Sequence, residues 1–185
     1  YVFHLVRRIN LIRSKIDGKD RVELFAMPQP QFHFLLDDFG KQAAIPDLDE
    51  KLSNLYRHYT LWRRDNTILN KEMNNNQKWL KRILTLNGGT LNWLVEWANQ
   101  DPSILPVLIS DYWGSVSSEK DVPRAFTLEG KERIGGFISE IEAALYDPLI
   151  IAELKLDFFK WYDQKYVQAW QDFAGAVVSG PKTLE

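Results

Sequence analysis

The chain has 185 residues, of which 45% are hydrophobic and 13% aromatic, so it can bury a core and is not a disordered or low-complexity sequence. Its 23 basic and 25 acidic residues leave a net charge of −2, which excludes the electrostatic excess that drives nonspecific binding of nucleic acids or anionic membranes. Because cysteine is absent, disulfides, thiol nucleophiles and cysteine-ligated zinc are excluded. We expect one domain or two closely packed subdomains, with no nucleic-acid partner.

The two ends predict that this chain is a piece of a longer protein. It begins with Tyr1 rather than Met, and its first turns are apolar on nearly all sides. Residues 180–185 are interpreted as a tail, in which Leu184-Glu185 is typical of an expression-vector remnant. No apolar run reaches the roughly 18 residues that a membrane-spanning helix needs. We therefore expect no direct membrane insertion by this chain and place any anchor or export signal outside it.

Apolar spacing predicts an N-terminal helix within residues 1–26. Its stripe repeats every three or four residues, and Gly18 follows it as a helix stop. Pro28 and Pro30 then block helix formation, so residues 27–46 are predicted to be a connector with at most a short helical turn.

A central helical region is predicted for residues 47–146. Asp47 is expected to cap a helix whose apolar register consists of Leu48, Leu52, Leu55, Tyr59, Trp62, Leu69, Met73, Leu80 and Ile83. Asn66 and then Asn74-Asn75-Asn76 interrupt this register. One kinked helix and two consecutive helices are both consistent with the pattern.

Glycine pairs and threonines mark the other boundaries of this region. Gly88-Gly89 is expected to end the helix, and Thr90 to cap a short helix that carries Leu91, Leu94, Val95 and Ala98. A loop-rich passage follows, with an exposed loop near residues 114–123. Thr127 then reads as the N-cap of a helix to about residue 146, which contains Gly135-Gly136.

The last predicted helix covers residues 147–179, with Asp147 as its cap and Pro148 in its first position. Its seam has heptad-like spacing over about four heptads and consists of Leu149, Ala152, Leu156, Phe159, Asp163, Tyr166, Trp170, Phe173 and Val177. A second apolar line runs through Ile151, Leu154, Phe158 and Tyr162. Because no alternating β-branched runs occur between hairpin turns, the fold class is all-α. We expect an elongated multi-helix bundle with a long C-terminal helix.

Asp163 is the polar member of this seam. Our preferred interpretation is that the seam turns toward solvent there. The alternative is a buried polar residue that sets the register against an Arg or Lys of a neighbouring helix.

The sequence contains no pattern typical of a metal or phosphate site. His4, His33 and His58 lie far apart in sequence, and none has the spacing of metal-binding histidine motifs. Neither glycine pair is followed by the Lys-Ser/Thr of a phosphate-binding loop. Gly135-Gly136 instead suggests either close approach of a neighbouring helix or a kink. We expect no metal, no cofactor and no catalytic residue.

An alternative function is glycan binding or hydrolysis, because aromatic residues stack on sugars and paired carboxylates can cleave glycosidic bonds. Asp111, beside Tyr112-Trp113, and either Glu129 or Glu132 are the candidate carboxylates. The remaining aromatic pairs, Trp93 with Trp97 and Tyr166 with Trp170, have the i to i+4 spacing of core helix contacts. We therefore favour a protein that is not an enzyme.

Several segments together resemble the IcmF/TssM family of bacterial type VI secretion. Residues 122–130, Val-Pro-Arg-Ala-Phe-Thr-Leu-Glu-Gly, are similar to the family signature Val-Pro-Gly-Ala-Phe-Thr-x-x-Gly and depart from it at Arg124. The other matching segments are Leu5-Val6-Arg7-Arg8-Ile9-Asn10-Leu11, Met27-Pro28-Gln29-Pro30, Leu91-Asn92-Trp93-Leu94-Val95-Glu96-Trp97-Ala98-Asn99, Ser110-Asp111-Tyr112-Trp113-Gly114 and the Tyr-x-x-x-Tyr-x-x-x-Trp pattern ending at Trp170. These segments occur in the order and spacing of the family, and together they span nearly the whole chain.

The resemblance implies a helical periplasmic segment of a bacterial inner-membrane protein that acts as a scaffold in a trans-envelope secretion complex. The implied partners are an inner-membrane subunit and an outer-membrane lipoprotein, the latter contacted through regions outside this chain. The resemblance leaves open whether the chain associates with itself and whether it belongs to a type IVB secretion system instead. The structural motif residues that the resemblance singles out are Pro123, Phe126, Thr127, Gly130 and Trp170. Phe126 is expected to fill the core.

Overall fold

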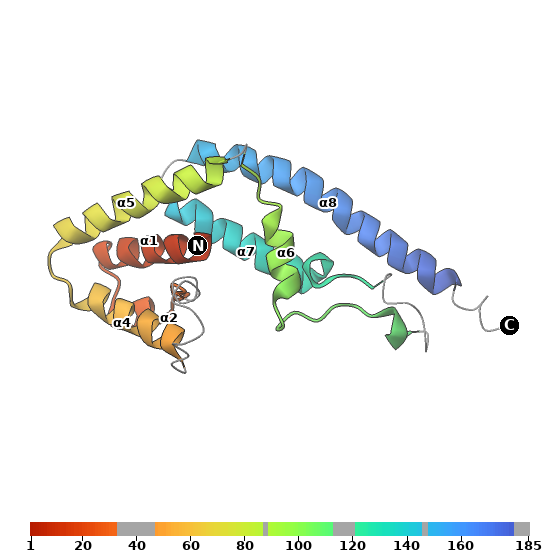
Figure 1. Ribbon diagram of the computed structural model, residues 1–185, viewed down its shortest axis with the longest axis horizontal. Helices are drawn as coiled ribbons and strands as arrows, with labels where there is room; N and C mark the ends of the chain where they lie inside the picture. Colours follow the sequence, from red (N-terminus) through yellow and green to blue (C-terminus); the bar gives the residue numbers. More distant parts are fainter. Residues whose placement is uncertain (33–46, 87–88, 113–120, 146–147, 180–185) are drawn as a thin grey trace, which may run out of the picture. The chain divides into compact units, whose positions relative to one another are not determined.

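We describe the protein from a computed structural model (Figure 1). It describes residues 1–32, 47–86, 89–112, 121–145 and 148–179. Within these ranges the regular structure is helical, apart from one isolated antiparallel bridge between Val107 and Val122. The predicted all-α class and long C-terminal helix are confirmed. None of the helices in the described ranges combines the length and apolarity needed to cross a membrane.

The chain divides into two compact units. The first consists of residues 1–89 with 140–147, and the second of residues 90–139 with 148–185. The helix α7 (Leu128–Ala144) begins in the second unit and ends in the first. The predicted subdivision of the chain followed helix boundaries, whereas the units combine segments that are distant in sequence.

The N-terminal helix α1 (Val2–Ile16) ends at the predicted glycine stop. Gly18 has a φ of 88°, its N–H donates to the carbonyl of Lys15 (3.2 Å), and the N–H of Lys19 donates to the carbonyl of Ser14 (3.0 Å). This pair of bonds is the Schellman motif, which requires the left-handed conformation that glycine adopts without strain.

A second helix, α2 (Arg21–Ala26), occupies the rest of the predicted N-terminal element. The Asp20 carboxylate accepts the N–H of Glu23 (2.9 Å), and the Glu23 carboxylate accepts the N–H of Asp20 (3.0 Å). This is a capping box. The Asp-x-x-Glu spacing at residues 20–23 was the available signal for a separate helix.

The long apolar register after residue 47 forms two helices, α4 (Leu48–Trp62) and α5 (Asn66–Thr85). The predicted cap is wrong, because Asp47 adopts a left-handed conformation with a φ of 60° and its side chain makes no capping bond. Asp65 caps α5 instead, since its carboxylate accepts the N–H of Thr67 (2.8 Å). The three consecutive asparagines lie within α5 and do not break it.

The buried face of α4 is mainly polar and differs from the predicted apolar stripe. Ser53, Arg57 and Thr60 are buried, whereas Leu55 and Trp62 are 63% and 71% exposed. Side-chain bonds to the preceding segment explain this orientation. Ser53 Oγ donates to the carbonyl of Pro30 (2.6 Å), and Arg57 donates to the carbonyl of Phe25 while its guanidinium lies 4.3 Å from the centre of the Phe25 ring.

The core of the first unit forms where α1 packs against α5, which run side by side in Figure 1. Leu5, Ile9 and Ile12 from α1 and Leu69 and Leu80 from α5 are all less than 2% exposed. A smaller cluster joins Leu11, Leu24 and Tyr56.

The second unit opens with α6 (Trp93–Gln100). The prediction that Thr90 caps this helix is wrong, because the cap position is Asn92, whose side chain makes no capping bond. The N–H of Leu94 donates to the carbonyl of Leu91 (2.9 Å), so a tight turn precedes the helix and delays its start. Two short 3₁₀ helices follow, η2 (Ile109–Asp111) and η4 (Arg124–Phe126).

The prediction of an exposed loop near residues 114–123 is wrong at its C-terminal end, where Val122 is fully buried. Its backbone exchanges two hydrogen bonds with Val107 (2.9 and 3.1 Å), which hold Val122 in the core. In α7, a Cβ added at Gly135 or Gly136 would meet no atom within 4 Å, and the helix is continuous there. Close approach of a neighbouring helix therefore does not explain this glycine pair.

The last helix, α8 (Pro148–Ser179), has 32 residues, or about 48 Å at about 1.5 Å per residue. Pro148 occupies its first position, as predicted. The predicted seam is not its buried face in the N-terminal half, where Ile151 and Phe158 are buried while Leu149 and Leu156 are 77% and 58% exposed. A seam of period 3.5 drifts by about 20° per heptad around a straight helix, so it cannot face one small core over its whole length.

Asp163 is exposed, which confirms the preferred interpretation that the seam turns toward solvent there. Its carboxylate lies 3.4 Å from Lys131 Nζ, and the side chains of Asp163 and Lys131 are 60% and 44% exposed. Such surface pairs contribute little to stability.

Several predicted features lie outside the described residues: most of the connector including His33, Gly88, Trp113 with most of its loop, Asp147, the side chain of Val177 and the tail from residue 180.

Candidate functional site

The residues singled out as a structural motif lie together in the second unit, where residues 122–130 meet α8. We call this arrangement the 122–130 joint. Pro123 occupies the cap position of η4, and its carbonyl accepts the N–H of Phe126 (2.9 Å). The N–H of Thr127 donates to the carbonyl of Arg124 (3.2 Å), and α7 begins at the next residue. A 3₁₀ turn therefore leads directly into a helix.

Thr127 is the N-cap of α7, as the sequence predicted. Its Oγ1 accepts the N–H of Gly130 (3.1 Å) and donates to the carbonyl of Arg124 (2.8 Å). The N–H of Lys131 donates to the Thr127 carbonyl (2.9 Å), which is the first bond of the helix. One buried hydroxyl thus satisfies a group of the turn and a group of the helix.

Gly130 is required because the turn passes directly over it. An added Cβ would lie 2.0 Å from the carbonyl oxygen of Arg124 and 2.9 Å from the backbone of Ala125. These are rigid backbone atoms, so any side chain at this position would push the turn away from α7. The Thr-x-x-Gly spacing of the signature therefore has a steric cause.

Two side chains of α8 bind the carbonyls that η4 leaves free. The Tyr162 hydroxyl donates to the carbonyl of Ala125 (2.5 Å), and Trp170 Nε1 donates to the carbonyl of Phe126 (2.9 Å). Tyr162 is completely buried, and this burial raises the pKa of its hydroxyl. Its ring lies 5.5 Å from that of Phe126. The joint is therefore fastened to α8 at two points that are eight residues apart along the helix.

The core next to the joint consists of Ile109, Val122, Phe173 and Ala176. Phe126 packs against it, as predicted, but is only partly buried, and the fully buried residue of the turn is Ala125. Phe126 therefore covers the edge of this core.

Arg124, the position that departs from the family signature, anchors the turn on its other side. Its Nε donates to the carbonyl of Ile104 (2.7 Å) and its guanidinium also donates to the carbonyl of Asn99 (3.2 Å). Asn99 in turn accepts the N–H of Ala125 through its side-chain oxygen (2.8 Å). The sequence reasoning missed Asn99, Arg124 and Tyr162 as joint residues, although each lies in a segment that carries the resemblance.

The first unit contains a partly buried polar network around Arg8. Its guanidinium pairs with Glu72 (2.5 Å) and lies 4.5 Å from the centre of the Tyr56 ring, and the Tyr56 hydroxyl donates to the same carboxylate oxygen (2.5 Å). Burial raises the pKa of Tyr56. The network joins α1, α4 and α5 by charge-assisted bonds.

His4 completes this network and is buried. Its Nδ1 lies 2.7 Å from the carbonyl of Gln31 and its Nε2 lies 3.0 Å from the Arg8 guanidinium. Neutral His4 with its hydrogen on Nδ1 satisfies both partners. Burial, reinforced by the Arg8 charge, lowers the pKa of His4 to about 4.

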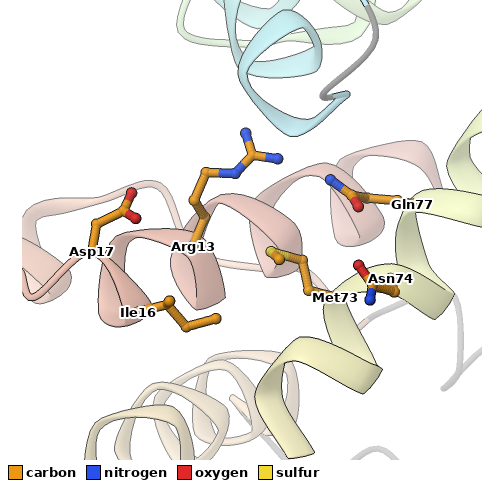
Figure 2. Close-up of a pocket in the computed structure, with 6 residues that line it drawn as sticks. All are labelled: Arg13, Ile16, Asp17, Met73, Asn74 and Gln77. Carbon is orange, nitrogen blue, oxygen red and sulfur yellow. The ribbon is translucent and has the colours of Figure 1, made fainter. Parts of the chain in front are cut away.

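A pocket of about 460 Å³ lies in the first unit between the end of α1 and the middle of α5 (Figure 2). Its lining residues are Arg13, Ile16, Asp17, Met73, Asn74 and Gln77. The head groups of Arg13 and Gln77 both donate to the carbonyl of Ala144 (3.2 and 2.9 Å). Their polar groups thus cap the C-terminal end of α7, and no pair of groups for acid–base chemistry results.

The described residues contain no group of three or more potential metal ligands. The candidate carboxylates Asp111, Glu129 and Glu132 are all exposed. Tyr112, beside Asp111, is 60% exposed and its ring packs against that of Phe173 (5.6 Å between centres). The glycan-active alternative stays a prediction that no contact of these residues supports.

Comparisons with family models, curated proteins and solved structures find no match to this chain. The structure places it in the class of all-α helix bundles with a long C-terminal helix. In both units, buried polar side chains bind backbone carbonyls and other side chains within the fold. The arrangement at the joint can position helices, and it presents no nucleophile with a neighbouring base.

Proposed function

We propose that this chain is a helical scaffold without enzymatic activity in the periplasmic part of the inner-membrane protein of a bacterial type VI secretion complex. It requires no cofactor. The observation that carries the proposal is that the signature segment at residues 122–130 and the late Tyr-Trp pattern, which resemble the same family, are bonded to each other through Tyr162 and Trp170. Segments that match a family separately and also form one joint support a common origin more strongly than either segment alone.

The physical character of the chain supports a scaffold role. Its buried polar groups hold turns and helix ends, and α8 is a continuous rod of 32 residues. The near-neutral net charge of −2 suits contacts with proteins better than contacts with polyanions. The partners under this proposal are the inner-membrane subunit of the same complex and, through other regions of the protein, the outer-membrane lipoprotein.

Deletion of the gene that encodes this chain tests the proposal. Type VI secretion by the cell of origin is expected to stop and to return when the gene is supplied on a plasmid. Normal type VI secretion in the deletion strain contradicts the proposal. In a cell that also has a type IVB system, loss of that system alone assigns the chain to the related secretion machine instead.

The periplasmic location can be tested separately because the chain contains no cysteine. Gln164 is exposed on α8, so Gln164→Cys in the full protein supplies a single new thiol from this region. A maleimide that does not cross the inner membrane is expected to label the variant more strongly than the unsubstituted protein in cells with a permeabilised outer membrane. Labelling only after lysis of the inner membrane contradicts a periplasmic location.

A further inference from the structure

The N-terminal half of α8 has apolar side chains on two faces. Ile151 and Phe158 are 2% exposed and belong to the core, whereas Leu149 and Leu156 are 77% and 58% exposed. Ala152 is also exposed, and Phe159 is partly buried. The outer line therefore runs through Leu149, Ala152, Leu156 and Phe159, and its first three members are exposed in the described part of the chain.

The spacing of this outer line indicates what would cover it. Steps of three, four and three residues are the coiled-coil period, which matches a second α-helix. Ala152 allows close approach of that helix, and Leu156 supplies a side chain large enough to fill a space between its residues. The charged neighbours Glu153, Asp157 and Lys160 are exposed beside the line, which disfavours burial in lipid.

The charges beside the outer line indicate which second helix would cover it. Glu153 and Lys160 lie one heptad apart on the same edge of the line, each one residue after a seam position. In an antiparallel pair of identical helices this edge faces its own copy, so Glu153 of each chain lies near Lys160 of the other. A parallel pair would instead bring Lys160 of one chain toward Lys155 of the other, which places like charges together.

We propose that two copies of this chain associate through antiparallel pairing of residues 149–160 of α8. Leu156 of each copy packs beside Phe159 of the other near the two-fold axis, with two Glu153–Lys160 ion pairs flanking them. This inference rests on the surface of α8 and does not depend on the proposed function.

Sedimentation equilibrium of the 185-residue chain over a concentration series tests this pairing. The unsubstituted chain is expected to show a monomer–dimer equilibrium, and Leu156→Glu to raise its dissociation constant by at least about tenfold, because it puts a charge in the apolar centre. Leu128→Glu is the matched control, since Leu128 is 67% exposed on α7 of the same unit and lies outside the line. It is expected to leave the equilibrium unchanged, and circular dichroism checks that both variants keep their helix content.

Charge exchange then tests the antiparallel arrangement. Glu153→Lys and Lys160→Glu are each expected to weaken the dimer, since each variant creates two like-charge contacts, and the double variant is expected to restore it. A chain that stays monomeric at all concentrations overturns the proposal, as does a dimer unaffected by Leu156→Glu. A dimer that the double variant fails to restore overturns the antiparallel pairing. None of these outcomes bears on the secretion test.

Discussion

The Thr127 cap of the second unit and helix α4 of the first unit are both held by side-chain hydrogen bonds to the backbone, but these bonds differ in how far they reach along the sequence. The cap at Thr127 binds the N–H of a residue three positions away. The bonds that orient α4 run from Ser53 to Pro30 and from Arg57 to Phe25, across 23 and 32 positions. A bond within one turn can be inferred from residue types and spacing, whereas a bond across a unit depends on how its segments fold together.

Among substitutions in the joint, we expect the largest loss in the free energy of unfolding at Gly130. Gly130→Ala places a Cβ 2.0 Å from the Arg124 carbonyl oxygen, and we expect the free energy of unfolding to fall by about 3 kcal/mol or more. Gly135→Ala in the same helix meets no atom within 4 Å and is expected to raise it by roughly 0.5 to 1 kcal/mol. Chemical denaturation of both variants measures the contrast. Equal effects would show that close contact at the turn is not the reason for Gly130.

The first unit is expected to lose stability in mild acid because of His4. Its pKa is lowered from 6.5 to about 4 in the folded chain, so the unfolded chain binds the proton first. The free energy of unfolding should be fully retained above pH 6.5 and should fall as the pH drops toward 4, by on the order of 2 kcal/mol.

Denaturation curves between pH 4 and pH 7 test this expectation, and His4→Gln is the comparison, because glutamine does not titrate. The variant should be less stable at pH 7 and should show a shallower pH dependence. Parallel pH dependences in the two proteins would mean that His4 is not responsible.

Removal of the Thr127 cap is expected to lower the free energy of unfolding less than Gly130→Ala does. Thr127→Ala leaves the N–H of Gly130 without its partner, and we expect a loss of about 1 kcal/mol in thermal or chemical denaturation. Thr127→Ser keeps the hydroxyl and should retain most of the stability. If both variants behave alike, the hydroxyl does not carry the cap.

The smallest effect is expected at Asp163. Because this residue is exposed and its partner Lys131 lies at 3.4 Å on the surface, Asp163→Leu should change the free energy of unfolding by no more than about 0.5 kcal/mol. A large loss of stability would restore the alternative in which Asp163 sets the register of α8.

The long helices show where prediction from sequence stopped. The start of α8, the glycine stop after α1 and the cap of α7 follow from local rules, and they were predicted. The buried faces of α4 and α8 were not, because both helices carry apolar residues on more than one face and periodicity does not say which face meets the core. The missed capping box of α2 was readable at Asp20 and Glu23.

The sequence by itself determined the all-α class, several helix boundaries and the cap at Thr127, because these depend on spacing and on groups within one or two turns. The tertiary structure decided that Tyr162 and Trp170 fasten the turn, that Arg124 anchors it to the loop after α6, and that Leu156 points away from the core. The aromatic residues, which make up 13% of the composition, are explained largely by such packing. Which side chains reach a given carbonyl depends on contacts between distant segments, and no local pattern in the sequence encodes them.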